Sequence, residues 1–144
     1  MFRSICVICV GNLCRSPTAE ILLRHALGGE VQVASAGLHA AVGRPMDPLA
    51  ALLLAEHGLD GSGHVARQAT RAVLLQADLI LAMERRHLRE IGQRVPEASG
   101  KALLLGKWLG EAEIADPYRR PRAAFEQAYA DIERSVARWL PYLR

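Results

Sequence analysis

A thiol and a guanidinium stand close together near the start of the sequence, in the stretch CVGNLCRSP at residues 9–17. Five residues separate Cys9 from Arg15, a spacing at which a short loop can wrap around a phosphate dianion while the sulfur attacks phosphorus. Arginine presents a planar fork of donors that matches two phosphate oxygens, which lysine does not. The pair is therefore a candidate nucleophile and phosphate-binding group.

The residues on either side of this stretch predict the geometry that such chemistry needs. The apolar run ICVIC at 5–9 is short enough for a buried parallel strand. Ser16 and Pro17 then predict a helix start, with Ser16 as the N-cap and Pro17 in the first helical position. Strand, tight loop and helix together form an anion cradle, because loop N–H groups can turn toward one point and the helix N-terminus is positive.

Within this cradle, Gly11 is expected to supply the backbone freedom of a concave loop, and Ser16 to donate its hydroxyl to the sulfur of Cys9. Helix N-termini and neighbouring cations favour the thiolate, so we expect Cys9 to be nucleophilic at neutral pH. The alternative is a buried structural thiol beside a solvated arginine, against which the strand, the glycine and the Ser-Pro pair argue. The expected phosphate-binding residues are Val10, Gly11, Asn12, Leu13, Cys14 and Ser16.

Apolar and helix-like segments alternate along the rest of the chain, which is typical of a parallel sheet with helices on both faces. Further strands are expected over 31–36, 79–82 and 102–105, and helices over 16–27, 47–57, 71–76, 84–91 and 125–140. The carboxyl ends of parallel strands share one sheet edge, so Cys9, Glu84 and Asp116 should meet there. The predicted fold is α/β, a single three-layer domain over 1–144 around a four-stranded parallel sheet.

The composition fits one small enzyme domain without a metal centre. At 144 residues, with 51% apolar and 23% charged residues, the chain can bury one core. Its cysteines all lie at positions 6, 9 and 14, with no histidines close by. This pattern is typical neither of the disulfide framework of a secreted domain nor of a zinc site. We therefore expect no metal and no other cofactor.

The net charge of +3 comes mostly from scattered arginines. Because no basic stripe carries interleaved aromatic residues, no nucleic acid partner is expected, whereas a mildly positive surface suits acidic phosphoproteins. The apolar stretches are far shorter than a membrane span and the sequence opens directly on a strand. No membrane insertion is expected, and a cytoplasmic location follows as the default.

Five motifs span almost the whole chain: CVGNLCRSPTAE at 9–20, SAGL at 35–38, GHVARQAT at 63–70, DLILAMERRHL at 78–88 and DPYRRPRAAFE at 116–126. They resemble the motifs of the low-molecular-weight protein-tyrosine phosphatases, most closely those of the bacterial branch associated with exopolysaccharide or capsule production. The resemblance implies a sheet order of 2-1-3-4 and hydrolysis of phosphotyrosine through a cysteinyl-phosphate. It also implies an autophosphorylated tyrosine kinase of exopolysaccharide export as substrate, and a monomer or weak oligomer.

The resemblance also assigns roles outside the cradle. On sequence alone, Asp116 is better explained as part of an Asp-Pro turn. With the cradle and the family's DPY motif, it becomes the acid that protonates the leaving oxygen and then activates water. Asn12, Ser35 and His64 match family positions that support the loop, and His64 is expected to reach Asn12.

Two positions depart from the family pattern. Many relatives have an aromatic residue after the SAG segment, whereas residues 38–42 here read LHAAV. Tyr118 is therefore expected to be the main wall of the cleft, helped by Leu38 or His39. Leu13 stands where the arginine-phosphatase relatives have threonine, which favours phosphotyrosine over phosphoarginine.

Cys14 leaves two interpretations open: a reversible disulfide with Cys9 that protects the nucleophile, or simple packing in the loop.

Three functions are alternatives to a tyrosine phosphatase. An arginine phosphatase is disfavoured by Leu13, and a thioredoxin-coupled arsenate reductase needs downstream cysteines that this chain lacks. A catalytically idle phosphoprotein-binding or redox-sensing module would have no use for the acid at Asp116.

Overall fold

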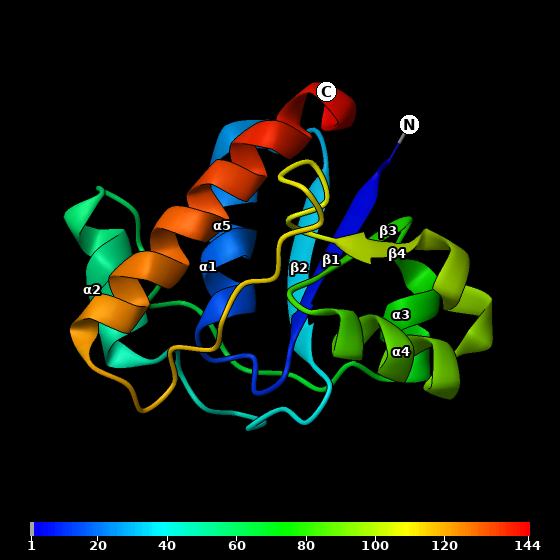
Figure 1. Cartoon of the computed structure of the whole chain (residues 1–144), viewed down its shortest axis with the longest axis horizontal. Helices are drawn as coiled ribbons and strands as arrows, with labels where there is room; N and C mark the ends of the chain where they lie inside the picture. Colours follow the sequence, from blue (N-terminus) through cyan, green and yellow to red (C-terminus); the bar gives the residue numbers. More distant parts are fainter. Residues whose placement is uncertain (1) are drawn as a thin grey trace.

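A four-stranded parallel sheet forms the centre of the computed structural model, which describes residues 2–144 (Figure 1). The strand order is β2-β1-β3-β4, so both the α/β class and the predicted order are confirmed. Three of the four predicted strands differ from the observed ones by one residue at one or both ends, and the strand over 79–82 matches. The strands are β1 (Ser4–Cys9), β2 (Gln32–Gly37), β3 (Leu79–Ala82) and β4 (Ala102–Leu104).

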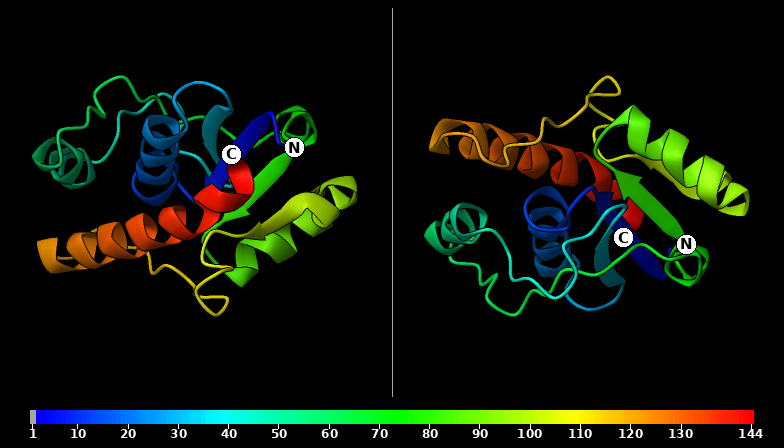
Figure 2. Two further views of the ribbon diagram at one scale, coloured as in Figure 1. Left: turned by 90° about the horizontal axis from the view of Figure 1, so that it is seen from above. Right: turned by 90° about the horizontal axis from the view of Figure 1, so that it is seen from below.

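Helices cover both faces of this sheet, as Figures 1 and 2 show. One layer consists of α1 (Arg15–Leu27) and the long α5 (Arg122–Leu143), with α2 (Pro48–Glu56) packed beside them. The other layer consists of α3 (Arg71–Gln76), α4 (Arg85–Arg94) and the short 3-10 helix η1 (Pro96–Lys101). In residues 2–144, none of the helices combines the length and apolar character required to cross a bilayer.

Alternation along β1 divides the core into two halves, because successive side chains of a strand point to opposite faces. Ile5, Val7 and Cys9 face α1 and α5, whereas Cys6 and Ile8 face α3 and α4. The apolar face of α5 packs on the first of these halves. Its anchor is Trp139, which is 2% exposed and donates its indole N–H to the carbonyl of Leu105 over 2.8 Å.

The start of α1 differs from the prediction. The helix begins at Arg15 with Cys14 in the N-cap position, and no side chain caps it. Ser16 therefore lies inside the first turn, and its assignment as N-cap was wrong. The reason is that the Ser16 hydroxyl is engaged by Cys9 and Asn12, as described below, and is not free to bond the helix's own N–H groups.

The loop after β2 lies directly against the loop after β1. A Cβ atom added to Gly37 would sit 2.4 Å from the carbonyl oxygen of Val10, so only glycine permits this approach. The isolated bridge between Gly37 and Gln68 extends the same edge toward a third segment. The last residue of β2 is thus small because the candidate cradle passes over it.

Candidate active site

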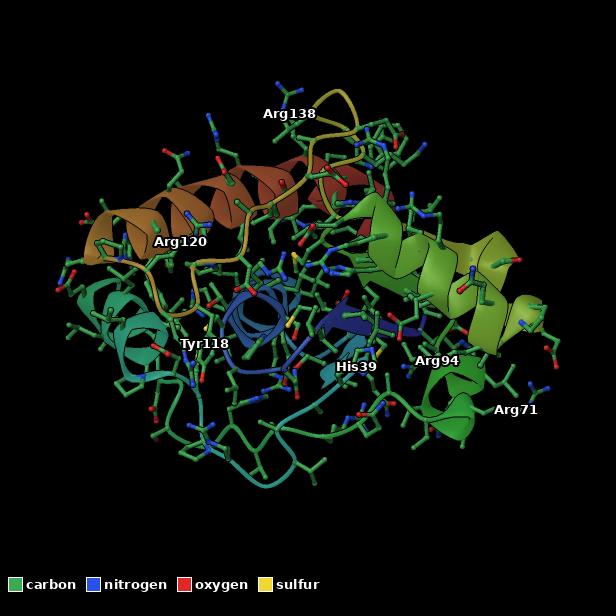
Figure 3. The ribbon with its side chains drawn as sticks, turned by 60° about the horizontal axis from the view of Figure 1, so that its bottom comes forward. His39, Arg71, Arg94, Tyr118, Arg120 and Arg138 are labelled. Atoms are coloured by element: carbon green, nitrogen blue, oxygen red, sulfur yellow. The ribbon has the colours of Figure 1, made fainter. Side chains whose placement is uncertain are left out.

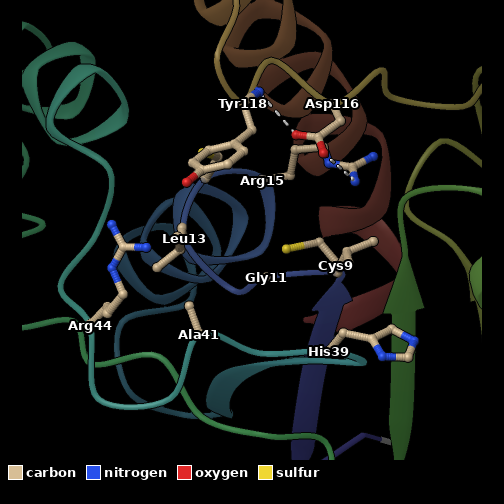
Figure 4. Close-up of a pocket in the computed structure, with 11 residues that line it drawn as sticks. Cys9, Gly11, Leu13, Arg15, His39, Ala41, Arg44, Asp116 and Tyr118 are labelled. Atoms are coloured by element: carbon tan, nitrogen blue, oxygen red, sulfur yellow. Dashed lines mark hydrogen bonds and ion pairs between the residues drawn. The ribbon is translucent and has the colours of Figure 1, made fainter.

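A pocket of about 250 Å³ opens at the carboxyl edge of the sheet (Figure 4). The loop after β1 forms its floor, and the loops after β2 and β4 form its walls. Cys9 lies at the end of β1, Arg15 at the start of α1, and Asp116 on the segment between β4 and α5. The lining residues are Cys9, Val10, Gly11, Leu13, Cys14, Arg15, His39, Ala41, Arg44, Asp116 and Tyr118.

The carbonyl oxygens of the loop after β1 all accept hydrogen bonds. Four of the donors are backbone N–H groups of the next loop: Leu38 to Cys9 (3.0 Å), His39 to Val10 (3.0 Å), Ala41 to Gly11 (3.1 Å) and Asp47 to Leu13 (2.9 Å). By contrast, the N–H groups of residues 10–14 have no acceptor anywhere in residues 2–144. Orphaned N–H groups along a concave loop form an anion site.

Asn12 holds this curvature through its backbone conformation and its side chain. Its φ angle is +61°, in the left-handed region that asparagine tolerates better than most residues. Gly11 has no positive φ, and a Cβ there would meet only Leu13 at an ordinary 3.8 Å. The expectation that Gly11 supplies the loop's conformational freedom was therefore wrong, since Asn12 makes the turn.

The side chain of Asn12 is fully buried behind the loop, away from the pocket. Its amide nitrogen donates to the hydroxyls of Ser16 (2.8 Å) and Ser35 (2.9 Å), and its amide oxygen accepts from the Arg67 N–H (3.0 Å). The ring Nε2 of His64 lies 2.7 Å from the Asn12 carbonyl, the contact expected from the sequence. Asn12 and Ser16 thus support the loop, and neither side chain lines the pocket.

The sulfur of Cys9 lies 2.9 Å from the Ser16 hydroxyl oxygen. Because that oxygen already accepts from the Asn12 amide, the Ser16 hydrogen is free to point at the sulfur. A hydroxyl donor and unpaired loop N–H groups both stabilise negative charge on the sulfur. Cys9 is only 3% exposed but opens into the pocket, so an anion entering the pocket meets it.

Arg15 is buried beneath the pocket and is anchored along one edge. Its Nη1 donates to the Ile114 carbonyl (2.7 Å) and to a carboxylate oxygen of Glu84 (2.5 Å). Its Nη2 lies 3.7 Å from an Asp116 oxygen, on the pocket side. The guanidinium is therefore fixed by groups below it, and its other edge is directed toward a bound anion.

Two titratable groups behind Arg15 have displaced pKa values. Burial opposes ionisation of Glu84, but hydrogen bonds from Arg86 and Arg15 outweigh it and lower the Glu84 pKa to about 2. Burial, followed by the nearby Arg15 charge, lowers the pKa of His87 to about 4. At neutral pH, Arg15 therefore rests on a charged carboxylate and next to an uncharged imidazole.

Asp116 and Tyr118 form the wall opposite the floor. The Asp116 side chain is 43% exposed, and its second carboxylate oxygen accepts the Tyr118 N–H over 3.1 Å. Figure 4 shows the carboxylate above the Cys9 sulfur, with the Tyr118 ring beside it. The sequence had suggested both positions, and the structure brings them together with Cys9 and Arg15 in one pocket.

Leu38 is a correction, because it was expected to help bind substrate. It is 1% exposed and packs with Ile8 and Ile80 on the α3 side of the sheet. His39, the next residue, faces the pocket instead, with its Nε2 2.9 Å from Glu90. Ala41 and Arg44 also line the pocket and were missed, because nothing in their local pattern shows how the loop folds back over the cradle.

The three cysteines carry free thiols but lie in different surroundings. Cys6 faces the opposite half of the core from Cys9, and burial raises its pKa to about 11. Cys14 shares the pocket with Cys9; burial first, then the charges of Asp47 and Cys9, raise its pKa. Within residues 2–144, no cluster of three or more His, Cys, Asp or Glu side chains is arranged to hold a metal ion.

The thiol is surrounded by a parallel strand, an anion-binding loop and a helix N-terminus. A buried arginine lies below it and a carboxylate lies above it. Together these groups define a cysteine-based phosphate site. The family model described as low molecular weight phosphotyrosine protein phosphatase matches residues 4–144. The chain belongs to this family.

Individual relatives cover nearly the whole chain. The low molecular weight protein-tyrosine-phosphatase Wzb of Escherichia coli K12 is 49% identical over 139 residues, covering 96% of this chain and 94% of Wzb. The crystal structure of the tyrosine phosphatase AmsI of Erwinia amylovora has a TM-score of 0.95 at 44% identity, covering 99% and 93% of the two chains. Wzb of Vibrio vulnificus, solved with benzylphosphonate, has a TM-score of 0.95 at 40% identity and covers 99% of each chain.

Proposed function

We propose that this protein is a protein-tyrosine phosphatase that hydrolyses phosphotyrosine through a cysteinyl-phosphate. The observation that carries the proposal is the loop of unpaired N–H groups at residues 10–14, with the Cys9 sulfur at its centre and Arg15 beneath it. Such a loop binds the three non-bridging oxygens of a phosphate monoester and stabilises the charge that they carry in the transition state.

In the first step, the Cys9 sulfur attacks phosphorus in line with the leaving oxygen. A sulfur–phosphorus bond forms as the bond from phosphorus to the tyrosine oxygen breaks. Asp116 transfers its proton to that oxygen, so that tyrosine leaves as a neutral phenol. The loop N–H groups and Arg15 hold the equatorial oxygens throughout, and Ser16 stabilises the sulfur before attack and as it departs.

In the second step, water displaces the sulfur from phosphorus. The Asp116 carboxylate accepts a proton from the attacking water, inorganic phosphate is released and the thiolate is regenerated. One carboxylic acid thus serves as acid and then as base, and the cycle consumes one water. No metal or other cofactor enters either step, because the loop and Arg15 supply the positive potential.

An aryl ester is the best substrate for this pocket. The Cys9 sulfur lies at the floor, so the phosphate must be carried on a group long enough to reach it, and phosphoserine is shorter than phosphotyrosine. The Tyr118 ring is positioned to pack against the substrate ring, an interaction favoured between aromatic groups. Leu13 adds apolar surface to the wall, which suits a phenyl ring better than the guanidinium of phosphoarginine.

The physiological substrate in this proposal is an autophosphorylated tyrosine kinase of exopolysaccharide export, and the reaction takes place in the cytoplasm. The resemblance to the exopolysaccharide-associated bacterial phosphatases supports both points. In this proposal the protein acts as a monomer or weak oligomer, as the same resemblance implies. Cys14 remains a candidate for a protective disulfide with Cys9.

The decisive experiment compares phosphotyrosine, phosphoserine and phosphoarginine in one peptide sequence, with a chelator present. Wild type should hydrolyse phosphotyrosine alone, and Cys9→Ser should bind phosphate without turnover. Cys6→Ala is the matched control, because Cys6 faces the other half of the core, and it should keep its activity. Phosphoarginine turnover would favour the arginine-phosphatase alternative, and binding without turnover by wild type would favour the idle module.

A further inference from the structure

The rim of the pocket carries an uneven distribution of charge. On one side, Glu90 pairs with Arg94 and lies 2.9 Å from His39, so a carboxylate already balances that side. On the other side, Arg44 lines the pocket with no hydrogen bond or ion pair from its side chain to any of residues 2–144. Figure 4 shows Arg44 across the pocket from Asp116, beyond Leu13 and Tyr118.

The backbone at Arg44 is fixed, although its side chain is exposed. The Arg44 N–H donates to the Ala41 carbonyl (3.1 Å), and the Arg44 carbonyl accepts from Ala66 (2.9 Å). Gly43 makes the intervening turn with a φ of +86°. The turn therefore projects the guanidinium from a rigid base, which reduces the entropy lost when that side chain binds a ligand.

A second unpaired arginine lies on the facing loop. Arg119 has a φ of +61°, a conformation that suits glycine at the third position of a turn, here closed by the Arg120 N–H and the Pro117 carbonyl. Its guanidinium lies 5.4 Å from the centre of the Tyr118 ring. The turn thus places the charge of Arg119 against the aromatic wall of the pocket.

The carboxylates nearest this side are already engaged. Asp116 accepts the Tyr118 N–H and lies 3.7 Å from Arg15, and Asp47 accepts the Leu49 N–H at the start of α2. Arg15 offsets the charge of Asp116, and the single negative charge of Asp47 is outnumbered by the two guanidinium groups of Arg44 and Arg119, so this half of the mouth is positive. The residues that flank a bound phosphotyrosine must cross the rim of the pocket, where Arg44 and Arg119 are available to pair with them.

We propose that Arg44 and Arg119 select phosphotyrosine sites that have an anionic side chain next to the phosphotyrosine. This inference rests on the proposed phosphatase function and names the substrate class of the same pocket. Carboxylates and a second phosphate share the recognised chemistry, since guanidinium groups bind both.

The test compares kcat/KM for peptides that differ only in the residues flanking one phosphotyrosine: aspartates, alanines or lysines. A fourth peptide has alanines and one phosphoserine near the phosphotyrosine. Wild type should prefer the aspartate peptide over the alanine peptide by about fivefold, and the lysine peptide should be the poorest substrate. The phosphoserine peptide distinguishes the two anion sources: a matching preference means that a second phosphate is also recognised, and no preference restricts recognition to carboxylates.

Arg44→Gln and Arg119→Gln should each reduce the ratio of aspartate to alanine turnover about two- to fivefold, the range of exposed ion pairs. Arg44→Lys, which keeps the charge, should retain most of that ratio. Arg138→Gln is the matched control, because Arg138 is exposed on α5 far from Tyr118 and His39 (Figure 3). Raising the ionic strength should weaken the wild-type preference, since salt screens exposed charges.

A wild-type ratio near one, or a ratio that neither glutamine variant lowers, would overturn this inference while leaving the phosphatase function intact. Failure of the phosphatase function gives a different result, in which wild type hydrolyses none of the phosphotyrosine peptides. The two failures are therefore separated by the alanine peptide, whose hydrolysis requires the loop, Cys9, Arg15 and Asp116 but no flanking anion.

Discussion

Replacing Glu84 with glutamine should destabilise the protein in a pH-dependent way. The pKa of Glu84 is about 2 instead of 4.5, a difference that corresponds to about 3 kcal/mol of stability at neutral pH. Because 19% of the Glu84 side chain is still exposed, solvent screening makes this an upper value. The same interaction supplies the buried Arg15 guanidinium with its carboxylate, so the expected penalty of losing it is up to about 3 kcal/mol.

The direction of the pH effect follows from the lowered pKa. A carboxylate of this kind stabilises the fold fully above its unfolded-state pKa and loses that contribution as the pH falls toward its folded-state pKa. The penalty of Glu84→Gln should thus be complete at neutral pH, decrease below pH 4.5 and disappear near pH 2.

Urea unfolding of wild type and Glu84→Gln at neutral pH and again below pH 4 measures this penalty. Glu126→Gln serves as the control, because Glu126 is 54% exposed and pairs with Arg122 at 3.5 Å on the surface of α5; its loss should cost no more than about 0.5 kcal/mol. A penalty for Glu84→Gln below about 1 kcal/mol at neutral pH, or one that does not decrease with acid, would refute the ion pair as the anchor of Arg15.

Three further predictions concern the pocket. Gly37→Ala should lower kcat for phosphotyrosine peptides at least about tenfold, because the added Cβ would displace the carbonyl of Val10. Gly63→Ala is the control and should be close to wild type in the same assay, because a Cβ at Gly63 would have no atom within 4 Å. Asp116→Asn should reduce kcat about 10²- to 10⁴-fold for phosphotyrosine and much less for an aryl phosphate with a better leaving group; equal losses would exclude a general acid. Cys14→Ser should make peroxide inactivation harder to reverse with a dithiol, and unchanged recovery would leave Cys14 a packing residue.

Local patterns predicted the parts of the fold that depend on nearest neighbours along the chain. The strand at 5–9 and the helices over 47–57 and 125–140 were predicted to within three residues at each end, because strand burial and helix periodicity depend on residues close together in the sequence. Since Cys9 and Arg15 belong to one continuous strand–loop–helix segment, their placement at one site could be predicted as well.

The errors occurred where two distant segments meet. Ser16 was predicted to be the N-cap, but its hydroxyl contacts Asn12 and Cys9 instead. Gly11 was predicted to be the flexible position, but Asn12 adopts the left-handed conformation. Leu38 and His39 are adjacent, so only the exact end of β2 decides which of them faces the pocket. Arg44 reaches the pocket because residues 38–47 bond back to the carbonyls of the cradle, a pairing that local sequence does not encode.

The alternation of β1 has a consequence for how this gene can change in length. Cys9 and Cys6 face opposite halves of the core, so inserting or deleting one residue within the strand would exchange its two faces. The sulfur would then be turned away from the loop into the packing of α3 and α4, whatever the new residue was. Frame-preserving insertions or deletions in this strand are therefore all-or-none for the reaction.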